Sequence, residues 1–428
     1  MNTVIQYIWQ AARTEVAMER SPVQNKKDAW GRHVRIYRVI SSLLDGLLKS
    51  KFNFTCEKPD MGKLSGPVIV IANHSCAWDP IFMAAAMKKR HMYFVASEHI
   101  LRWKVLGPVL NYLVEPIPRK KASSGAGTVM MCLRHLRAGH SVCLFAEGEQ
   151  AWNGITRPIV SSTGKMVSKS GATLITYRIE GAYLSLPRWA KKARKGRVHA
   201  HPVGIYPPEV LKGMKPEEIN AVINRDIYFN TWEWQESLPG GPAGFRIKGG
   251  KSGLAERLEK SVFTCPECGN IGTLSSAGDK IRCSCGVCIR YTETGFFDPP
   301  TPFRCIPDWE AFDRKEICRI ADTAKAEGMS RVLFEDEAAV LTKIGEGHTG
   351  EDLGSGRLAL ESAGGKLLLK VAGHSFDLED ISIMALVLSN ILLFSEGKDY
   401  CQIYSNDANL RKYLYMWEYI RDNGLLSS

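Results

Sequence analysis

Long apolar stretches are missing from this sequence of 428 residues. No run approaches the roughly 20 apolar residues that a membrane-spanning helix needs, and the best candidate, residues 381–394, contains Ser389 and Asn390. The N-terminus also lacks the basic start and apolar core of a secretory signal, and it carries Glu15 and Glu19 instead. We therefore expect the protein to be made and kept in the cytosol.

Acidic residues are scarce in the first half of the chain. Residues 1–200 contain 31 Lys and Arg against 12 Asp and Glu, a balance of +19, whereas residues 201–428 contain 25 against 33, a balance of −8. A basic N-terminal half favours an anionic partner, such as phospholipid head groups, nucleic acid or a phosphorylated cofactor. The 45% of hydrophobic and 24% of charged residues are typical of a globular protein.

Internal repeats are also absent, and the length predicts roughly two to three domains. The glycine-rich residues 240–250 and the pair Pro299–Pro300 predict boundaries between domains. In chain order we predict basic amphipathic helices (1–50), an α/β domain (51–240), a linker (241–262), a cysteine-rich module (263–298) and a small β-rich domain with a closing helix (310–428). The strand pattern and terminal helix of the last domain faintly resemble a pleckstrin-homology-like domain.

Two basic segments are candidates for a membrane surface. Residues 30–49 combine apolar residues at helical spacing, among them Trp30 and Leu44, with several arginines. Such a helix suits a membrane surface or packing on its own core. The basic run 188–197 includes Trp189, and it could face lipid head groups, bind nucleic acid or form a solvated turn. Among these functional interpretations the lipid surface is favoured.

Twelve cysteines do not form one framework, because five lie within residues 265–288 and the others are scattered. Cys265 and Cys268 form one tight pair and Cys283 and Cys285 another, each followed by glycine, and together they resemble a zinc ribbon. Four thiolates give zinc a closed tetrahedral site, so its role should be structural. Cys288 could replace Cys283 in an alternative register, but the matching glycines favour the first set.

The segment from Asn73 to Pro80 carries the clearest chemical signal. It follows residues 67–71, an apolar run typical of a buried parallel strand, and α/β sheets build sites where strands end. Asp79 before Pro80 predicts a helix start with Asp79 as the N-cap. His74 then lies in the preceding loop, where the carboxylate can fix its tautomer and stabilise the imidazolium. A hydroxyl deprotonated by this histidine can attack a thioester.

The same segment allows plainer interpretations. Asp79 could simply cap a helix while His74 is a solvated loop residue. Alternatively, Cys76 could be the nucleophile of a Cys–His pair.

His74 and Asp79 after a buried strand, with Glu147 and Gly148 at the end of another strand, make residues 50–240 resemble the lysophospholipid and glycerol-phosphate acyltransferase family. This resemblance implies a three-layer α/β fold and acyl transfer from acyl-CoA or acyl-carrier protein. It also implies that His74 is the general base, oriented by Asp79, and that Arg119 binds the phosphate of the acceptor. The substrate-binding residues that it implies are Asn73, Arg119, Glu147 and Gly148.

Two departures from the family pattern concern charge and backbone. The third motif, usually Phe-Pro-Glu-Gly-Thr/Asn-Arg, here ends in Glu149 and Gln150, which removes a phosphate-binding cation. Thr176 stands where the fourth motif usually has proline. The missing charge could come from Arg157, Lys165, Arg178 or Arg188.

We therefore predict an O-acyltransferase of phospholipid biosynthesis that transfers a fatty acyl group to the hydroxyl of a lysophospholipid or glycerol-phosphate-type acceptor. We expect a peripheral protein on the inner face of the cell membrane, with structural zinc and with the membrane phospholipid surface, a lysolipid and the acyl donor as partners. One alternative is a non-enzymatic lipid-binding or regulatory protein on the same scaffold. A zinc-ribbon nucleic-acid binder is disfavoured, since residues 251–300 hold six basic and six acidic residues.

Overall fold

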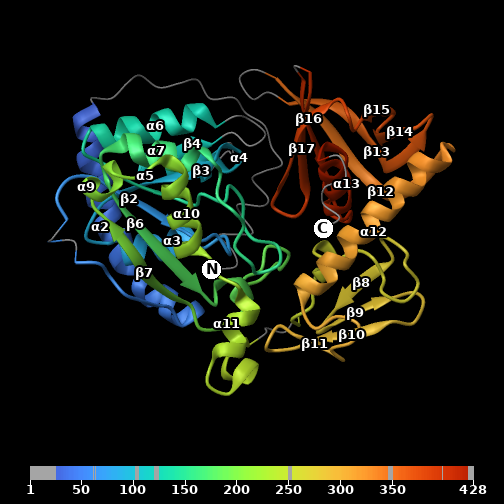
Figure 1. The fold of residues 1–428 in the computed structure, drawn as a ribbon, viewed down its shortest axis with the longest axis horizontal. Helices are drawn as coiled ribbons and strands as arrows, with labels where there is room; N and C mark the ends of the chain where they lie inside the picture. The colour runs from blue at the N-terminus through green and yellow to red at the C-terminus, as the bar shows by residue number, and fades with distance from the viewer. Residues whose placement is uncertain are drawn as a thin grey trace. The chain divides into compact units, whose positions relative to one another are not determined.

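The computed structural model describes residues 26–60, 62, 64–101, 106–119, 125–248, 253–345, 350–397 and 399–422 (Figure 1). The chain forms two compact units. Unit 1 contains the residues up to 151, then 155–183 and 197–231, and unit 2 contains 152–154, 184–196 and the residues from 232 onward. The predicted boundaries between smaller domains stay predictions, and residues 1–25 of the predicted helical segment lie outside the described residues.

A single sheet forms the centre of unit 1. Its strands are β1 (Thr55–Cys56), β2 (Val68–Ala72), β3 (Met92–Ser97), β4 (Ile117–Arg119), β5 (Ser141–Leu144), β6 (Thr173–Glu180) and β7 (His199–Tyr206). Their spatial order is β1-β7-β6-β2-β5-β3-β4, and all neighbouring pairs except β6–β7 are parallel. The buried parallel strand expected at residues 67–71 is therefore confirmed as β2, which lies between β6 and β5.

Helices cover this sheet. They are α2 (Lys26–Phe52), α3 (Asp79–Ala86), α4 (Glu98–Leu101), α5 (Leu106–Val114), α6 (Ala126–Arg137), α7 (Ser162–Ser170), α9 (Pro208–Lys212) and α10 (Pro216–Ile227). One hydrophobic core joins alternate strand residues, such as Ile69 and Leu174, to α6, α7 and α10. The intervening residues, such as Val70, point to the opposite face, and α3 packs against β7 and α2. Unit 1 is thus a mixed α/β unit with a mostly parallel sheet.

The amphipathic helix expected at residues 30–49 is confirmed within α2. Tyr37, Leu48 and Phe52 are buried in the core, and the Phe52 ring lies 5.2 Å from that of Phe82 in α3. Arg35 and Arg38, in contrast, are exposed. The helix therefore packs on its own core with one face and leaves another face in solvent.

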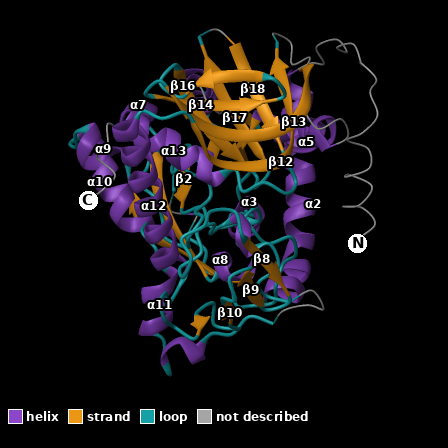
Figure 2. Ribbon diagram, turned by 90° about the vertical axis from the view of Figure 1, so that its right-hand side faces the viewer, coloured by secondary structure: helices purple, strands orange, loops and turns teal. Residues whose placement is uncertain are grey.

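Unit 2 contains two antiparallel sheets. The smaller sheet has the order β11-β10-β9-β8 and the larger one the order β15-β14-β13-β12-β18-β17-β16 (Figure 2). The strands are β8 (Leu274–Ala277), β9 (Lys280–Cys283), β10 (Cys288–Tyr291), β11 (Phe297–Asp298), β12 (Arg331–Ile344), β13 (Gly350–Ala363), β14 (Lys366–Val371), β15 (His374–Asp377), β16 (Ile381–Val387), β17 (Ile391–Glu396) and β18 (Asp399–Tyr404). The expected β-rich C-terminal region is therefore present.

Two longer helices pack against each other in unit 2, α12 (Ile306–Glu327) and α13 (Arg411–Arg421). Their sequence signals are clear at α12, where Asp308 accepts the N–H of Cys305 at the start and Gly328 ends the helix with a positive φ. The remaining helices are α8 (Ala182–Ser185), α11 (Thr231–Ser237), η2 (Gly241–Gly244) and η3 (Leu258–Lys260). Among the described helices, none is long and apolar enough to cross a membrane.

The expectation that Trp189 meets a lipid surface is wrong. Its side chain is fully buried in unit 2, where its ring lies 5.6 Å from that of Tyr291. Arg194 is buried as well, with its guanidinium 4.6 Å from the Trp189 ring. This part of the basic run 188–197 is therefore packed inside the unit, because the Trp189 ring contacts Tyr291 and the side chain of Arg194.

Candidate functional site

The loop between β2 and α3 is organised around the carboxylate of Asp79, which is fully buried. Its Oδ2 lies 2.9 Å from Nδ1 of His74 and accepts the N–H groups of Ser75 at 2.6 Å and Cys76 at 2.8 Å. The prediction that Asp79 is the N-cap is wrong: Trp78 is the N-cap and Asp79 is the first helical residue. Its side chain turns back toward the loop because three donors converge on it there.

The Asp79 carboxylate determines which nitrogen of His74 can act as a base. Since a carboxylate only accepts, Nδ1 of His74 carries the proton of that bond and Nε2 keeps its lone pair. Nε2 has no hydrogen-bond partner within the described part of the chain. The imidazole is 17% exposed and stacks on the Phe145 ring, with the centroids 4.4 Å apart. Nε2 is thus the ring nitrogen that is left to act as a base.

Cys76 lies in the same loop, but its thiol is fully buried and contacts Oδ1 of Asp79 at 3.3 Å. Burial first, and then the Asp79 carboxylate, raise the pKa of the Cys76 thiol well above its usual value. A protonated, buried thiol is a poor nucleophile. The geometry therefore disfavours the Cys–His interpretation.

Glu147 lies after β5 and joins this loop to a second one. Its Oε1 accepts the N–H of His74 at 2.6 Å, and its Oε2 accepts the N–H of Arg157 at 2.7 Å. The N–H of Ala151 donates to the carbonyl oxygen of His74 at 2.8 Å. Burial raises the pKa of Glu147 to about 8, although the two N–H groups favour the charged form. Both carboxyl oxygens are thus engaged by backbone.

The side chain of Asn73, at the end of β2, also forms hydrogen bonds with backbone groups. Its Oδ1 accepts the N–H of Ile179 in β6 at 2.7 Å, and its Nδ2 donates to the Ile179 carbonyl at 2.9 Å. The residue is fully buried. Asn73 therefore fixes the start of the loop between β2 and α3 against the neighbouring strand.

Arg119 and Gly148 meet at the same edge of the sheet. Gly148 has a φ of +82°, and a Cβ atom there would lie 3.0 Å from Nη2 of Arg119. Only glycine allows this backbone conformation and this approach without strain. Within the described residues, Arg119 forms no ion pair, and burial lowers its pKa. Its side chain lines a cavity of about 70 Å³, together with Phe145, Thr163 and other, mostly apolar residues.

The four candidates for the missing cation lie in different places. Arg157 forms an ion pair with Glu149, and its backbone N–H reaches Glu147. Arg178 donates to the carbonyl oxygen of Asp226, Lys165 is exposed on α7, and Arg188 belongs to unit 2. Arg157 is therefore the candidate that is bonded to the loop of the third motif.

Thr176, at the position where the fourth motif usually has proline, forms a side-chain hydrogen bond that proline could not make. Thr176 donates to the buried carboxylate of Asp226 at 2.8 Å, and Tyr206 donates to the same oxygen at 2.6 Å. Sequence reasoning missed this network, because Asp226 is 50 residues away from Thr176.

The four cysteines of the two predicted turns come together in one cluster. The sulfur atoms of Cys265, Cys268, Cys283 and Cys285 all lie within 4.8 Å of one another, so the cluster could hold a metal ion. Gly269 and Gly286 have positive φ values of 69° and 108°, which the two tight turns require. Cys288 lies on β10 and is not a member of this cluster.

Two comparisons with known proteins find acyltransferases. The acyltransferase family model matches residues 53–180, a range that includes His74, Asp79, Arg119 and Glu147. The crystal structure of the 1-acyl-sn-glycerophosphate acyltransferase PlsC from Thermotoga maritima is similar at a TM-score of 0.40 and 14% identity, covering 55% of this chain and 90% of that chain. By the family match, the segment from residue 53 to residue 180 is an acyltransferase-family domain.

Proposed function

We propose that the protein is an O-acyltransferase of phospholipid biosynthesis that acylates a hydroxyl of a lysophospholipid or glycerol-phosphate-type lipid. The observation that carries this proposal is the His74–Asp79 pair at 2.9 Å, inside the segment that matches the acyltransferase family. The acyl donor is a thioester, either acyl-CoA or acyl-carrier protein.

In the proposed mechanism, Nε2 of His74 takes the proton of the acceptor hydroxyl while its oxygen attacks the thioester carbonyl. Asp79 keeps the other nitrogen protonated and stabilises the imidazolium that forms. The tetrahedral intermediate then collapses, the C–S bond breaks, and the proton passes from His74 to the thiolate. The products are an ester and a free thiol, so atoms and charges balance.

We assign the acceptor phosphate to Arg119. A guanidinium without an ion pair among the described residues, beside the loop of the third motif, suits phosphate oxygens as a bidentate partner. Asn73 and Glu147 instead position the loop, since their polar atoms bond to backbone. The cavity beside Arg119 and Phe145 is mostly apolar and suits the part of an acyl chain closest to the reacting group.

We further propose that the four clustered cysteines hold a structural zinc ion in a ribbon, and that the seven-stranded sheet with α13 is a pleckstrin-homology-like domain. Four thiolates fit zinc in number and chemistry, and they leave no open position for catalysis. The proposed place of action is a phospholipid surface, the inner face of the cell membrane.

Replacement of the base tests the mechanism directly. His74→Ala should lower acyl transfer by about 10²- to 10⁴-fold, since this is the typical contribution of a general base, and Asp79→Asn should be nearly as damaging. The matched control is His201→Ala on β7, a histidine outside the site. Transfer would be measured with a labelled acyl donor and detergent-dispersed lysolipid. Near-normal activity of folded His74→Ala protein would exclude this mechanism.

A further inference from the structure

A short excursion of the chain follows the loop of the third motif. The chain leaves unit 1 after Ala151, contributes Trp152–Gly154 to unit 2 and returns to unit 1 at Ile155. Both ends of the excursion are fixed within unit 1. The N–H of Ala151 donates to the carbonyl oxygen of His74 at 2.8 Å, and Ile155 forms a β-bridge with Asn230. The residue that precedes the excursion is therefore bonded to the residue that carries the proposed base.

Within unit 2 the excursion is held at two consecutive residues. Trp152 is 6% exposed, and the guanidinium groups of Arg188 and Arg411 lie 4.2 Å and 4.6 Å from the centre of its ring. The carbonyl oxygen of Asn153 accepts the indole N–H of Trp232 at 2.8 Å. A cation is attracted by the electrons of an aromatic ring, and burial strengthens this attraction. We call Trp152, Arg188 and Arg411 the arginine clamp.

Each arginine of the clamp is anchored by a different part of unit 2. Nε of Arg188 donates to the carbonyl oxygen of Leu388, directly after β16, at 3.0 Å. Arg411 is buried, and its guanidinium lies 3.1 Å from a carboxylate oxygen of Glu310 in α12. The same guanidinium donates to the hydroxyl oxygen of Ser261 at 3.2 Å. The clamp thus ties the excursion to the seven-stranded sheet, to α12 and to the segment just before the cysteine cluster.

A buried tryptophan can simply be a core residue, but the chain neighbour of Trp152 gives it a second effect. The peptide bond between Ala151 and Trp152 is planar, so only the two backbone dihedrals of Ala151 separate this bond from the N–H group that His74 accepts. A displacement of Trp152 is therefore passed to the His74 backbone. Glu147 holds the N–H of His74, so the two contacts together fix both ends of this residue.

We propose that Trp152 is a positioning residue of acyl transfer: the arginine clamp holds Trp152, and Trp152 holds Ala151 where its N–H binds the His74 carbonyl oxygen. This inference rests on the proposed function, because the base that it positions is His74. It gives unit 2 a part in the reaction, since all three residues of the clamp belong to unit 2. Arg188, one of the candidates for the missing cation of the third motif, then serves the site through Trp152 and not as a phosphate ligand.

Steady-state kinetics of the full chain test this role. Trp152→Ala should lower kcat by about 10- to 100-fold, because a misplacement of about 1 Å caused far from the reacting atoms can cost about 10²-fold. KM for both substrates should stay within about twofold, since the clamp acts on the base. Trp152→Phe keeps a ring for both guanidinium groups and should hold kcat within about fivefold of the wild type. Arg188→Gln removes one cation without opening a cavity and should lower kcat by about threefold.

The matched control is Trp417→Ala, assayed like the other variants below the unfolding transitions. Trp417 is 4% exposed, its ring lies 4.9 Å from the guanidinium of Arg421, and its indole N–H donates to the carbonyl oxygen of Ile381 at 2.8 Å. It is a buried tryptophan of unit 2 in a similar contact, but it lies on α13 and not beside Ala151. Its replacement should lower stability and leave kcat within about twofold. Equal falls of kcat in the two alanine variants, or an unchanged kcat in Trp152→Ala, would overturn the proposal.

A spectrum of the protein with isotope-labelled histidine gives a readout that needs no activity. The Nδ1 proton of His74, which bonds to the Asp79 carboxylate, should give a low-field signal that is absent from His74→Ala. This signal should shift or broaden in Trp152→Ala and stay in place in Trp417→Ala. An unchanged signal in Trp152→Ala would contradict the positioning role. Failure of the proposed function would instead show as no transfer by the wild type to detergent-dispersed lysolipid, so the two failures are distinct.

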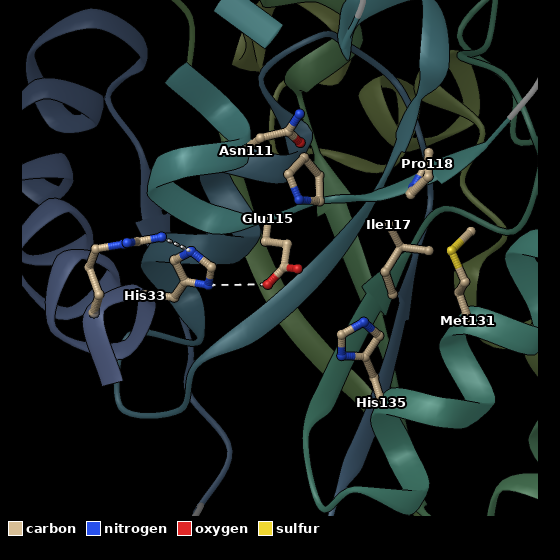
Figure 3. Close-up of a pocket in the computed structure, with 9 residues that line it drawn as sticks. His33, Asn111, Glu115, Ile117, Pro118, Met131 and His135 are labelled. Carbon is tan, nitrogen blue, oxygen red and sulfur yellow. Dashed lines mark hydrogen bonds and ion pairs between the residues drawn. The ribbon is translucent and has the colours of Figure 1, made fainter. Parts of the chain in front are cut away.

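Two other histidines of unit 1 provide an internal reference in the same spectra. His33 of α2 and His135 of α6 line a cavity of about 390 Å³, together with Glu115 (Figure 3). Glu115 lies two residues before β4, so this cavity is near the end of the sheet where parallel strands begin, whereas the His74 loop follows the end of β2. The signals of His33 and His135 should therefore not move in Trp152→Ala. If they moved together with the His74 signal, a general change of unit 1 would replace the proposed role.

Discussion

Among single residues, Glu147 combines burial with two short hydrogen bonds to backbone N–H groups from different parts of the chain. One of these N–H groups belongs to His74, the proposed base, so the carboxyl group holds the backbone from which the imidazole projects. Burial raises its pKa to about 8 in the folded protein. In the unfolded chain the same group should titrate near its ordinary value of about 4.3.

This difference predicts how stability depends on pH. Between about pH 4.3 and 8 the folded protein holds a proton on Glu147 that the unfolded chain has released, so the free energy of unfolding falls as pH rises. In Glu147→Gln this contribution should vanish, and the variant should lose less stability than the wild type between pH 6 and 9. Urea unfolding at several pH values measures the two slopes.

The same variant should also lose activity, because one carboxyl oxygen is replaced by an NH2 group that faces a backbone N–H. The loss of one of the two hydrogen bonds that Glu147 accepts should lower the free energy of unfolding by about 1–3 kcal/mol. The control is Glu180→Gln, at the end of β6 and outside the site. Parallel pH slopes for wild type and Glu147→Gln would contradict the raised pKa.

At the level of elements, the two cysteine turns make the sharpest prediction. Purified protein should contain close to one zinc ion per chain, and Cys265→Ser with Cys268→Ser should abolish it. Cys288→Ser is a matched control because Cys288 lies on β10, outside the cluster; it should keep its zinc. Elemental analysis of freshly prepared protein measures the metal, and loss of zinc from the Cys288→Ser variant would instead support the alternative register.

The elements that the sequence predicted correctly are those with a strong local signal. The strand β2 is a continuous apolar run, α2 has apolar residues at helical spacing, and the paired cysteines have fixed local spacing. The contact between His74 and Asp79 could likewise be predicted, because the two residues are only five positions apart in the sequence.

The features that the sequence did not predict depend on distant partners. Asn73 and Ile179 are 106 residues apart, and His74 and Glu147 are 73 apart. Trp189 is buried because Arg194 and Tyr291 enclose it, although its neighbours in the sequence are basic.

At the scale of the whole molecule, the structure connects the cysteine cluster to the helices of unit 2. The buried carboxylate of Asp313 in α12 accepts the N–H groups of Phe263 at 3.2 Å and Thr264 at 2.8 Å. Thr264 precedes Cys265, and its carbonyl oxygen accepts the indole N–H of Trp309 at 2.8 Å. A metal ion that fixes the first cysteine turn would therefore also stabilise the contacts of residues 263–264 with α12.

This arrangement predicts the effect of metal removal. Two units with separate cores should give two unfolding transitions in calorimetry, and a chelator should lower the midpoint of one of them by at least about 5 °C. The chelator should have no effect on Cys265→Ser with Cys268→Ser, which serves as the control. A melting curve of the wild type that does not change with chelator would contradict a structural metal.

The Asn73 contact with Ile179 also determines when the proposed active site can form during synthesis of the chain. The ribosome makes His74 early, but the backbone that holds its loop in place is added later, at Glu147, Arg157 and Ile179. At roughly 5–20 residues per second, the chain from residue 74 to residue 179 takes about 5–20 s to make. The proposed catalytic base is thus translated early in its domain, and it becomes usable only after nearly the whole acyltransferase-family segment has emerged.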